Sequence, residues 1–400
     1  MSKVAYFAPY FWPEVIGSAP YCTDVARWLH SHGHEVEVVA FRPHYPDPDD
    51  FTEWAEGARD RETFEGMHIS RVRVGKRGSG GFLTRLKNDV RYLGGALRAT
   101  FRSDLADVDA VVAYVPSSLA LLGAMALSWR TGARFTGVVH DIESGLATSL
   151  GMAQKPMLLW LMRRIEQLAF NRTDQLIVLS AAMKTELRDL GCVRPITALP
   201  IWSDTFPDQP IDDSSSPALC YSGNFGKKQN LDLLLPLIGM LSARRPEVRV
   251  ILRGDGTERD RIQLQVEAMK TRNTVFLPLA PAAQFAAALQ EARVHLVPQA
   301  NNTGNYAIPS KVFSIMAAGR PFVCIAEAGT PLSLLAEQTG AGICVPPNDD
   351  EALFATIEQL VTDVARCREM GEHGRAYVRD NLSRPKVLGE YERIILGRAS

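Results

Sequence analysis

Apolar and polar positions follow two patterns that alternate along the chain. Short continuous apolar runs, such as residues 3–8, 110–115 and 134–139, are typical of strands buried on both faces of a parallel sheet. Longer stretches, such as residues 19–32, carry apolar residues at helical spacing, and Gly33 ends that stretch. Because the two patterns alternate nearly throughout, the sequence predicts an α/β protein with mostly parallel, doubly wound sheets.

The predicted elements form two series separated by a break. In the first series we expect strands at residues 3–8, 35–41, 110–115, 134–139, 175–179 and 196–199, with helices at 19–32, 84–102, 119–129, 156–171 and from 181. Residues 62–74 indicate short paired strands around Glu65 and Gly66. Residues 204–217, rich in Pro, Asp and Ser, are typical of an interdomain linker.

The second series begins directly after this break. We expect strands at residues 218–222, 248–253, 274–277, 294–297, 322–326 and 342–345, with helices at 230–243, from 258, near 282–291, and at 350–366, 368–380 and 385–396. Two Rossmann-like halves facing a central cleft would hold ligands at the carboxyl ends of both sets of strands.

One stretch of the second series, residues 305–324, combines a loop, a helix and a strand. Pro309 and Ser310 begin the helix, with Ser310 at the expected N-cap and Lys311 in the first turn. Gly319 ends the helix in a position that tolerates a left-handed backbone. The unpaired N–H groups at such a helix start attract anions such as phosphate, although an ordinary capped helix gives the same pattern.

Composition and charge narrow the class of protein. A chain of 400 residues is long enough for two domains, and its net charge of −1 gives no indication of a nucleic-acid partner. The six cysteines are scattered without metal-binding spacing, so we expect reduced core thiols in a cytosolic protein. Residues 110–129 carry no charge and could span a bilayer, but Pro116, Ser117 and Ser118 favour a division into strand and helix.

Two loops of the first series follow strand ends. The first strand leads into a loop containing Glu14, Gly17 and Ser18, which lacks the Gly-x-Gly-x-x-Gly pattern of a dinucleotide fold. Gly17 at a helix start suits contact with a ligand, and a plain strand–helix turn fits equally well. Later, His140, Asp141 and Glu143 place three ionisable groups beyond an apolar strand, where they could bind or orient hydroxyl groups or serve as structural partners.

Two glycine turns follow strands of the second series. The first contains Gly223, Asn224, Gly226, Lys227 and Lys228 before a predicted helix. Its glycines allow close backbone approach and its lysines neutralise charge, which suits a diphosphate. A second turn, residues 253–256, contains Gly254.

These motifs, taken in order, resemble those of glycosyltransferase family four, with the two-domain GT-B fold. Within it, the chain resembles bacterial capsule and exopolysaccharide enzymes of the colanic-acid type. The matching pieces are residues 13–17, 140–143, 201–204, 222–228, 254–256 and 309–321, so the resemblance covers nearly the whole chain.

The resemblance implies a retaining transfer from a nucleotide sugar. The acceptor-side domain would span residues 1–203, with a C-terminal helix at about 383–400 packing back on it, and the donor domain residues 218–382. The resemblance implies a role for His140 at the donor sugar, assisted by Asp141 and Glu143. We assign Glu14, Gly17 and Ser18 to the acceptor side. The expected donor-binding residues are Gly223, Asn224, Gly226, Lys227, Lys228, Gly254, Tyr306, Pro309, Ser310, Lys311 and Ser314.

The sequence departs from the broad family at four positions in these motifs. Tyr306 and Ser314 stand where the broad family has two glutamates, the second of which holds the donor ribose. Asn224 and Gln229 stand where it has Arg and Lys. These departures leave open a degenerate, non-catalytic partner in polysaccharide assembly.

Residues 76–102 carry seven Lys or Arg against one Asp, together with apolar residues at largely helical spacing. A basic amphipathic helix of this kind suits an anionic membrane surface. A helix packed on the sheet, with a solvated charged face, fits the same pattern.

The resulting hypothesis is a cytoplasmic retaining glycosyltransferase, a hexosyl- or deoxyhexosyltransferase, at the inner face of the plasma membrane. Its donor would be a UDP-, GDP- or dTDP-sugar, and its acceptor a glycan or lipid-linked glycan. We expect no cofactor and no metal, because Lys227, Lys228 and the helix at Ser310 could offset the charge of the leaving diphosphate. A nucleotide-sugar epimerase on the same scaffold is the alternative enzyme.

Overall fold

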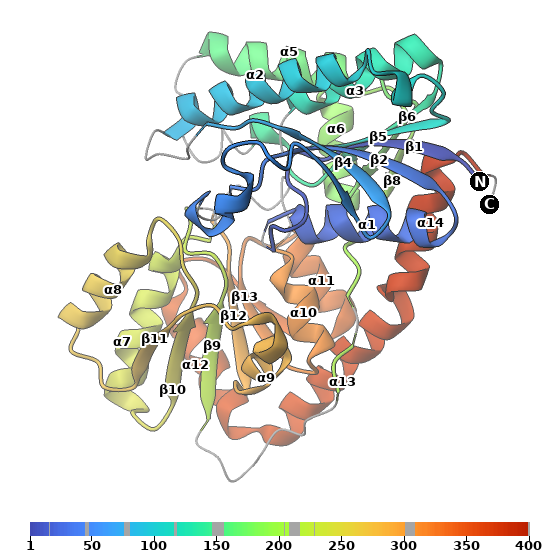
Figure 1. Ribbon diagram of the computed structural model, residues 1–400. Coiled ribbons are helices and arrows are strands. Elements are labelled where there is room, and N and C mark those ends of the chain that lie inside the picture. Colours follow the sequence, from blue (N-terminus) through green and yellow to red (C-terminus); the bar gives the residue numbers. More distant parts are fainter. Residues whose placement is uncertain are drawn as a thin grey trace. The chain divides into compact units, whose positions relative to one another are not determined.

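The computed structural model describes residues 1–400 except 16, 45–47, 76–80, 116–117, 146–155, 204, 208–216, 228, 301–308 and 399–400. The chain divides into two compact units (Figure 1). Unit 1 comprises Met1–Pro200 and Val387–Ser400, and unit 2 comprises Ile201–Lys386. Most of the expected linker, residues 204–217, lies outside the described residues.

Unit 1 is built on an eight-stranded sheet in the order β3-β4-β2-β1-β5-β6-β7-β8. The strands are β1 (Lys3–Phe7), β2 (Glu35–Phe41), β3 (Arg61–Phe64), β4 (Met67–Val72), β5 (Ala110–Val115), β6 (Arg134–Val139), β7 (Gln175–Val178) and β8 (Ile196–Ala198). Neighbouring strands are parallel, except that β3 and β4 form the predicted hairpin. Glu65 and Gly66 form its turn, with φ values of 51° and 87°. The second value is one that glycine adopts without strain.

Helices cover both faces of this sheet. On one side lie α1 (Ala19–Ser31) and α14 (Arg384–Ile395), and on the other lie α2 (Gly81–Ala99), α3 (Ser118–Thr131) and α5 (Pro156–Phe170) (Figure 1). The shorter helices are η1 (Pro48–Trp54), η2 (Ser103–Leu105) and α6 (Ala181–Asp189). The charge-free stretch 110–129 is divided between β5 and α3, as predicted. Among the described residues, every helix is too short or too polar to cross a membrane.

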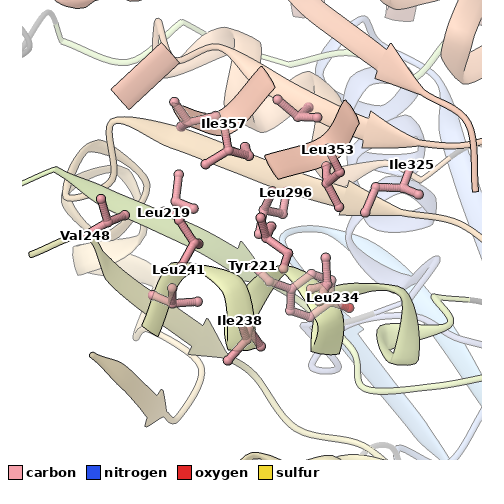
Figure 2. Close-up of a cluster of buried hydrophobic side chains, with 14 of the residues drawn as sticks. Leu219, Tyr221, Leu234, Ile238, Leu241, Val248, Leu296, Ile325, Leu353 and Ile357 are labelled. Carbon is pink, nitrogen blue, oxygen red and sulfur yellow. The ribbon is translucent and has the colours of Figure 1, made fainter. Parts of the chain in front are cut away.

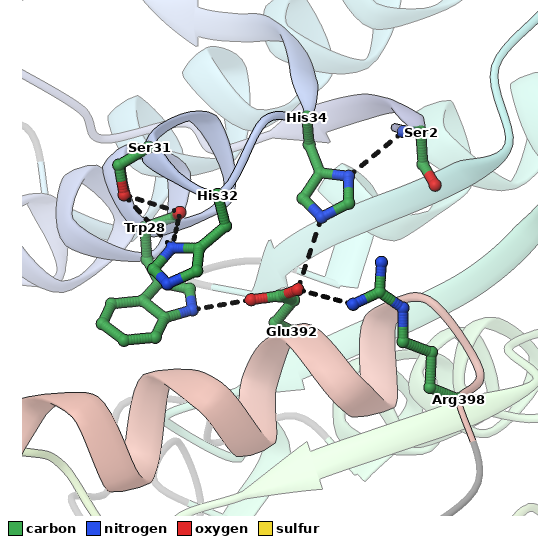
Figure 3. Close-up of polar contacts among 7 residues, drawn as sticks. All are labelled: Ser2, Trp28, Ser31, His32, His34, Glu392 and Arg398. Atoms are coloured by element: carbon green, nitrogen blue, oxygen red, sulfur yellow. Dashed lines mark hydrogen bonds and ion pairs between the residues drawn. The ribbon is translucent and has the colours of Figure 1, made fainter.

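The end of the chain is joined to its beginning by a polar cluster around Glu392 on α14 (Figure 3). The Glu392 carboxylate accepts hydrogen bonds from Trp28 Nε1 at 2.9 Å and from Arg398 Nη1 at 2.8 Å. His34 Nδ1 accepts from the backbone N–H of Ser2, so Nε2 carries the proton and faces Glu392 Oε1 at 3.4 Å. Burial opposes ionisation of Glu392, but its hydrogen bonds from Trp28 and His34 outweigh burial and lower its pKa.

Unit 2 is built on a six-stranded parallel sheet in the order β11-β10-β9-β12-β13-β14. Its strands are β9 (Ala218–Ser222), β10 (Arg249–Arg253), β11 (Thr274–Leu277), β12 (Val294–Pro298), β13 (Phe322–Ile325) and β14 (Gly342–Val345). Its helices are η3 (Leu231–Leu234), α7 (Leu235–Arg244), α8 (Arg259–Ala268), η4 (Ala282–Gln284), α9 (Phe285–Gln290), α10 (Lys311–Ala317), α11 (Pro331–Thr339), α12 (Asp350–Thr362) and α13 (Val364–Asn381).

The core of unit 2 follows the two-residue period of its strands (Figure 2). Leu219 and Tyr221 of β9 pack in the large cluster with α7 and α12, whereas Ala218 and Cys220 belong to a cluster on the other face. This buried frame fixes where β9 and β10 end, and therefore where the two glycine turns lie.

Two local features of unit 2 differ from the expectations. Helix α11 was not predicted, although Thr330 caps its start by accepting from Ser333 N–H and Pro331 follows at the first helical position. The predicted helix 230–243 begins as the 3₁₀ turn η3. Gly319 has the predicted left-handed conformation, with a φ of 67°.

Candidate functional site

The two glycine turns of unit 2 lie against each other at the ends of neighbouring strands. Gly223 N–H donates to the Arg253 carbonyl at 2.9 Å, and Phe225 N–H donates to the Asp255 carbonyl at 2.7 Å. A Cβ atom at Gly254 would collide with the carbonyl oxygen of Gly223. Gly223 and Gly254 also have φ values of 141° and 143°, so both the conformation and the close contact require glycine.

Lys311, the first residue of α10, points toward this loop. Its Nζ lies 3.8 Å from the centroid of the Tyr221 ring. A Cβ atom added at Gly223 would lie only 2.7 Å from the same Nζ. The Tyr221 hydroxyl in turn donates to the Asn224 carbonyl at 2.5 Å. One buried tyrosine therefore contacts both the glycine loop and the lysine.

The ammonium group of Lys311 has an unusual environment. The residue as a whole is half-buried, but Nζ is shielded from solvent and has no hydrogen-bond partner among the described residues. Burial lowers the Lys311 pKa to about 7, with an opposing contribution from Cys220. A bound anion beside Nζ would supply the missing partner and favour the charged form of the lysine.

The other predicted donor residues are only partly described. Pro309, Ser310 and Ser314 are half-buried, and Ser310 occupies the N-cap position of α10 without a side-chain capping bond. Asn224 and Lys227 are exposed on the glycine loop, where Gly226 is half-buried. Lys228 and Tyr306 lie outside the described residues.

In unit 1, His140 follows β6 and lies between two aromatic rings. Its ring centroid is 5.0 Å from that of Tyr114 and 6.0 Å from that of Tyr21, both in edge-on geometry. His140 Nε2 is buried and has no hydrogen-bond partner among the described residues. Burial lowers the His140 pKa to about 4, against the influence of Asp141, so the ring is neutral at neutral pH.

The turn after His140 is held by a residue that the sequence did not single out. Glu166 on α5 is 1% exposed, and its Oε1 accepts from Ser144 N–H at 3.0 Å. Its second oxygen, Oε2, has no hydrogen-bond partner among the described residues, and burial raises the Glu166 pKa to about 7. Asp141 and Glu143 are half-buried on the same turn. The sequence signal for Glu166 is a carboxylate on the apolar, inward side of a helix.

The first loop of unit 1 combines one buried and two more accessible residues. Glu14 is 4% exposed, and its Oε1 accepts from the backbone N–H of His44 at 2.9 Å. Gly17 is exposed, with a φ of 69° and open space where a Cβ would stand. Ser18 is half-buried at the N-cap of α1. Glu14 therefore has a structural contact within its own unit, while Gly17 is accessible.

The described residues contain no group of three or more His, Cys, Asp or Glu side chains that could hold a metal ion. Lys311 and Lys227 bring positive charge to the glycine turns, whereas the Arg253 guanidinium is paired with Glu291. The glycine turns of unit 2 can therefore bind an anion, and the loop after β6 in unit 1 can form hydrogen bonds through the neutral ring of His140.

Two Rossmann-like units, each with its own parallel sheet, are the architecture of the GT-B fold. A glycosyl transferase 4-like domain matches residues 17–202, and the glycosyl transferases group 1 family matches residues 203–377. The chain belongs to glycosyltransferase family four, and the predicted family resemblance and fold class are both confirmed.

A relative of known sequence agrees with this assignment, and solved structures share the fold. The chain is 26% identical to the putative colanic acid biosynthesis glycosyl transferase WcaI of Escherichia coli, over 99% of this chain and 100% of that protein. Sucrose-phosphate synthase from Thermosynechococcus elongatus has a similar fold, with a TM-score of 0.78, 17% identity and full coverage of both chains. Anabaena HepE, solved in complex with UDP-glucose, has a TM-score of 0.69 and 14% identity over 99% of this chain and 100% of that one.

Proposed function

We propose that this protein transfers a sugar, with retention of anomeric configuration, from a nucleoside-diphosphate sugar to a glycan or lipid-linked acceptor. The observation that carries the proposal is the buried Lys311 ammonium beside the glycine turn. A shielded cation without a hydrogen-bond partner is unfavourable on its own, and an anionic diphosphate would satisfy it. The HepE complex, which holds UDP-glucose on the same fold, supports a nucleotide sugar as the anion.

In this proposal, unit 2 binds the donor. Gly223 and Gly254 let the backbone approach the diphosphate, and Lys311 neutralises its charge as the leaving group departs. Lys227 is exposed on the same loop and would add a weaker, solvent-screened contact. These cations would offset the charge of the leaving group without a metal. The remaining proposed donor contacts are Asn224, Gly226, Lys228, Tyr306, Pro309, Ser310 and Ser314.

Unit 1 would supply the groups at the transferred sugar and the acceptor. A neutral His140 can accept from, or donate to, a sugar hydroxyl through Nε2, and the two tyrosine rings restrict its orientation. Asp141 and Glu143 would assist by orientation. Gly17 and Ser18 would line the acceptor side, with Glu14 holding their loop in place.

The reaction would belong to surface polysaccharide or glycoconjugate biosynthesis on the cytoplasmic side of the membrane. The name of the E. coli relative, which matches over its full length, supports this context. The sugar would be a hexose or deoxyhexose. An epimerase on the same scaffold would instead release free sugar product without consuming an acceptor.

The proposal can be tested with purified protein in two stages. Thermal shifts with UDP, GDP and dTDP identify the base, because a ligand that binds only the folded state raises the unfolding temperature. The matching nucleotide sugars are then incubated with and without a lipid-linked oligosaccharide acceptor, and proton NMR reports the anomeric configuration of the product. Acceptor-dependent release of nucleoside diphosphate with retention is expected. Sugar release without acceptor, or no binding of any diphosphate, would overturn the proposal.

A further inference from the structure

Three helices of unit 1 form one outer layer over the same face of its sheet. Helix α3 lies between α2 and α5 and contacts both (Figure 1). The sides of α2 and α5 that are turned away from the sheet therefore belong to a single outer surface, here called the α2–α3–α5 surface. The sequence indicated only its α2 part.

The outward side of α5 is apolar. Met157 is 81% exposed, Trp160 58%, Leu161 48% and Leu168 49%. Their spacing of three, one and seven residues places them on one side of an α-helix. The opposite side of α5 carries the buried Glu166, Ala169 and Phe170, so this helix is apolar toward the sheet and toward solvent.

The neighbouring helices extend this apolar surface. Trp129 at the end of α3 is 61% exposed, and it and Trp160 are the two exposed tryptophans among the described residues. On and just beyond α2, Val90, Leu97 and Phe101 are also exposed. Exposed apolar side chains gathered on neighbouring helices indicate an interaction surface.

The charges on the α2–α3–α5 surface are nearly all positive. The exposed basic residues of the described side chains are Lys87, Arg91, Arg98, Arg130, Arg163 and Arg164. The acidic residues of these three helices are Asp89, which is half-buried, and Glu166, which is buried. Arg164 lies 5.6 Å from the Trp160 ring centroid, and Arg172 lies 5.3 Å from that of Trp129.

We infer that the α2–α3–α5 surface binds an anionic lipid bilayer, with α5 at its centre. Tryptophan and arginine side by side suit the interfacial region, where the ring enters the acyl boundary and the guanidinium contacts lipid phosphates. A second copy of this chain fits less well, because two such surfaces would bring like charges together. The inference does not depend on which sugar the protein transfers.

The test measures binding of the full chain to vesicles of phosphatidylcholine alone or with phosphatidylglycerol. We expect binding only with phosphatidylglycerol, and weaker binding at high salt. Arg163→Gln combined with Arg164→Gln should lower partitioning about 30-fold, since each basic residue near an anionic surface contributes roughly fivefold. Trp160→Ser combined with Leu161→Ser should lower it by about tenfold or more.

Matched variants in unit 2 serve as controls. Leu264→Ser replaces a leucine that is 66% exposed, and Arg244→Gln with Arg379→Gln removes two exposed arginines. These changes should leave vesicle binding unchanged, and far-UV circular dichroism confirms that every variant is folded. The insertion of α5 into the bilayer is measured by labelling Met157→Cys with a polarity-sensitive dye, whose emission should shift to the blue when vesicles are added. The same dye at Leu264→Cys should show no such shift.

Several results would overturn the inference. They are absence of binding to phosphatidylglycerol vesicles at low salt, equal binding to neutral vesicles, and equal loss in the α5 and unit 2 variants. Concentration-dependent dimerisation that Trp160→Ser abolishes, without vesicle binding, would assign the surface to a second copy instead.

Discussion

His140 after β6 in unit 1 and Lys311 beside the glycine turns of unit 2 each bury a side-chain nitrogen that lacks a hydrogen-bond partner among the described residues, yet these two nitrogens behave differently. Burial lowers the pKa of His140 to about 4 and that of Lys311 to about 7. His140 is therefore a constant neutral hydrogen-bonding group near pH 7, whereas Lys311 is poised to gain a proton when an anion binds. Burial thus keeps the protonation state of His140 constant near pH 7, whereas it makes the protonation state of Lys311 depend on whether an anion is bound.

The largest effect that separates the two loops should come from His140→Ala. We expect kcat to fall on the order of 10²-fold or more, because a positioned polar group at the reacting sugar is lost. Affinity for the free nucleoside diphosphate should barely change, because unit 2 binds it in our proposal. Turnover measured beside calorimetric binding decides this, and equal losses in both would place His140 at the nucleotide.

The next largest effect is expected for Lys311→Met, which keeps the length of the side chain and removes its charge. Affinity for the diphosphate should fall about 10- to 100-fold, the range for a lost hydrogen bond to a charged group. Lys227→Ala is the matched control, and it should cost less because that lysine is exposed. Titration calorimetry of both variants measures the difference. Similar losses in both would remove the special role of the buried lysine.

A smaller effect concerns pH. Because the Lys311 pKa is about 7 without ligand and should rise beside a diphosphate, binding should be accompanied by proton uptake. Diphosphate affinity should therefore fall roughly five- to tenfold between pH 7.5 and 8.5. Lys311→Met should show no such slope. An affinity that is flat with pH in the unmodified protein would mean that the lysine stays charged throughout.

The smallest effect on catalysis is expected for Glu166→Gln, because glutamine keeps an oxygen that can accept from Ser144 N–H. Its influence should instead be on stability. The pKa of Glu166 in the folded protein is about 7, above the ordinary value of 4.5. The stability that the protonated carboxyl group contributes is therefore fully present below pH 4.5 and is lost as pH rises through 7.

The free energy of unfolding of the unmodified protein should therefore decrease between pH 5 and pH 8 because Glu166 ionises. For Glu166→Gln the decrease should be smaller. Denaturant unfolding at the two pH values measures the difference. Glu166→Ala, which leaves Ser144 N–H without its acceptor, should lower kcat as well. If both variants follow the pH profile of the unmodified protein, the carboxyl group does not titrate in this range.

The alternation of apolar runs predicted nearly all of the fold, because each buried parallel strand reads as a continuous apolar segment. Helix α11 escaped prediction because nine residues with few charges resemble a loop between two strands. At the candidate site, the strand-end glycines and Lys311 could be named from the sequence. The contacts between them could not, since Lys311 and Tyr221 are brought together only by the packing of α10 on the sheet.

For Glu166 and for the α5 part of the α2–α3–α5 surface, too, the sequence shows the residues but not what they contact. A glutamate within an apolar helix is visible in the sequence, but its partner, Ser144, lies 22 residues earlier in the sequence. The exposed apolar residues of α5 have the same spacing as core residues would. Only the three-dimensional position of the helix shows which of its apolar sides is covered.

The cluster around Glu392 has a consequence for how the chain is made. Unit 2 is one continuous segment, Ile201–Lys386, whereas unit 1 needs Val387–Ser400 in addition to the first 200 residues. During synthesis, Trp28 and His34 remain without this acceptor until Glu392 has been translated, which comes after all of unit 2. Unit 2, which lies between the two segments of unit 1, is therefore fully translated before unit 1 can be completed.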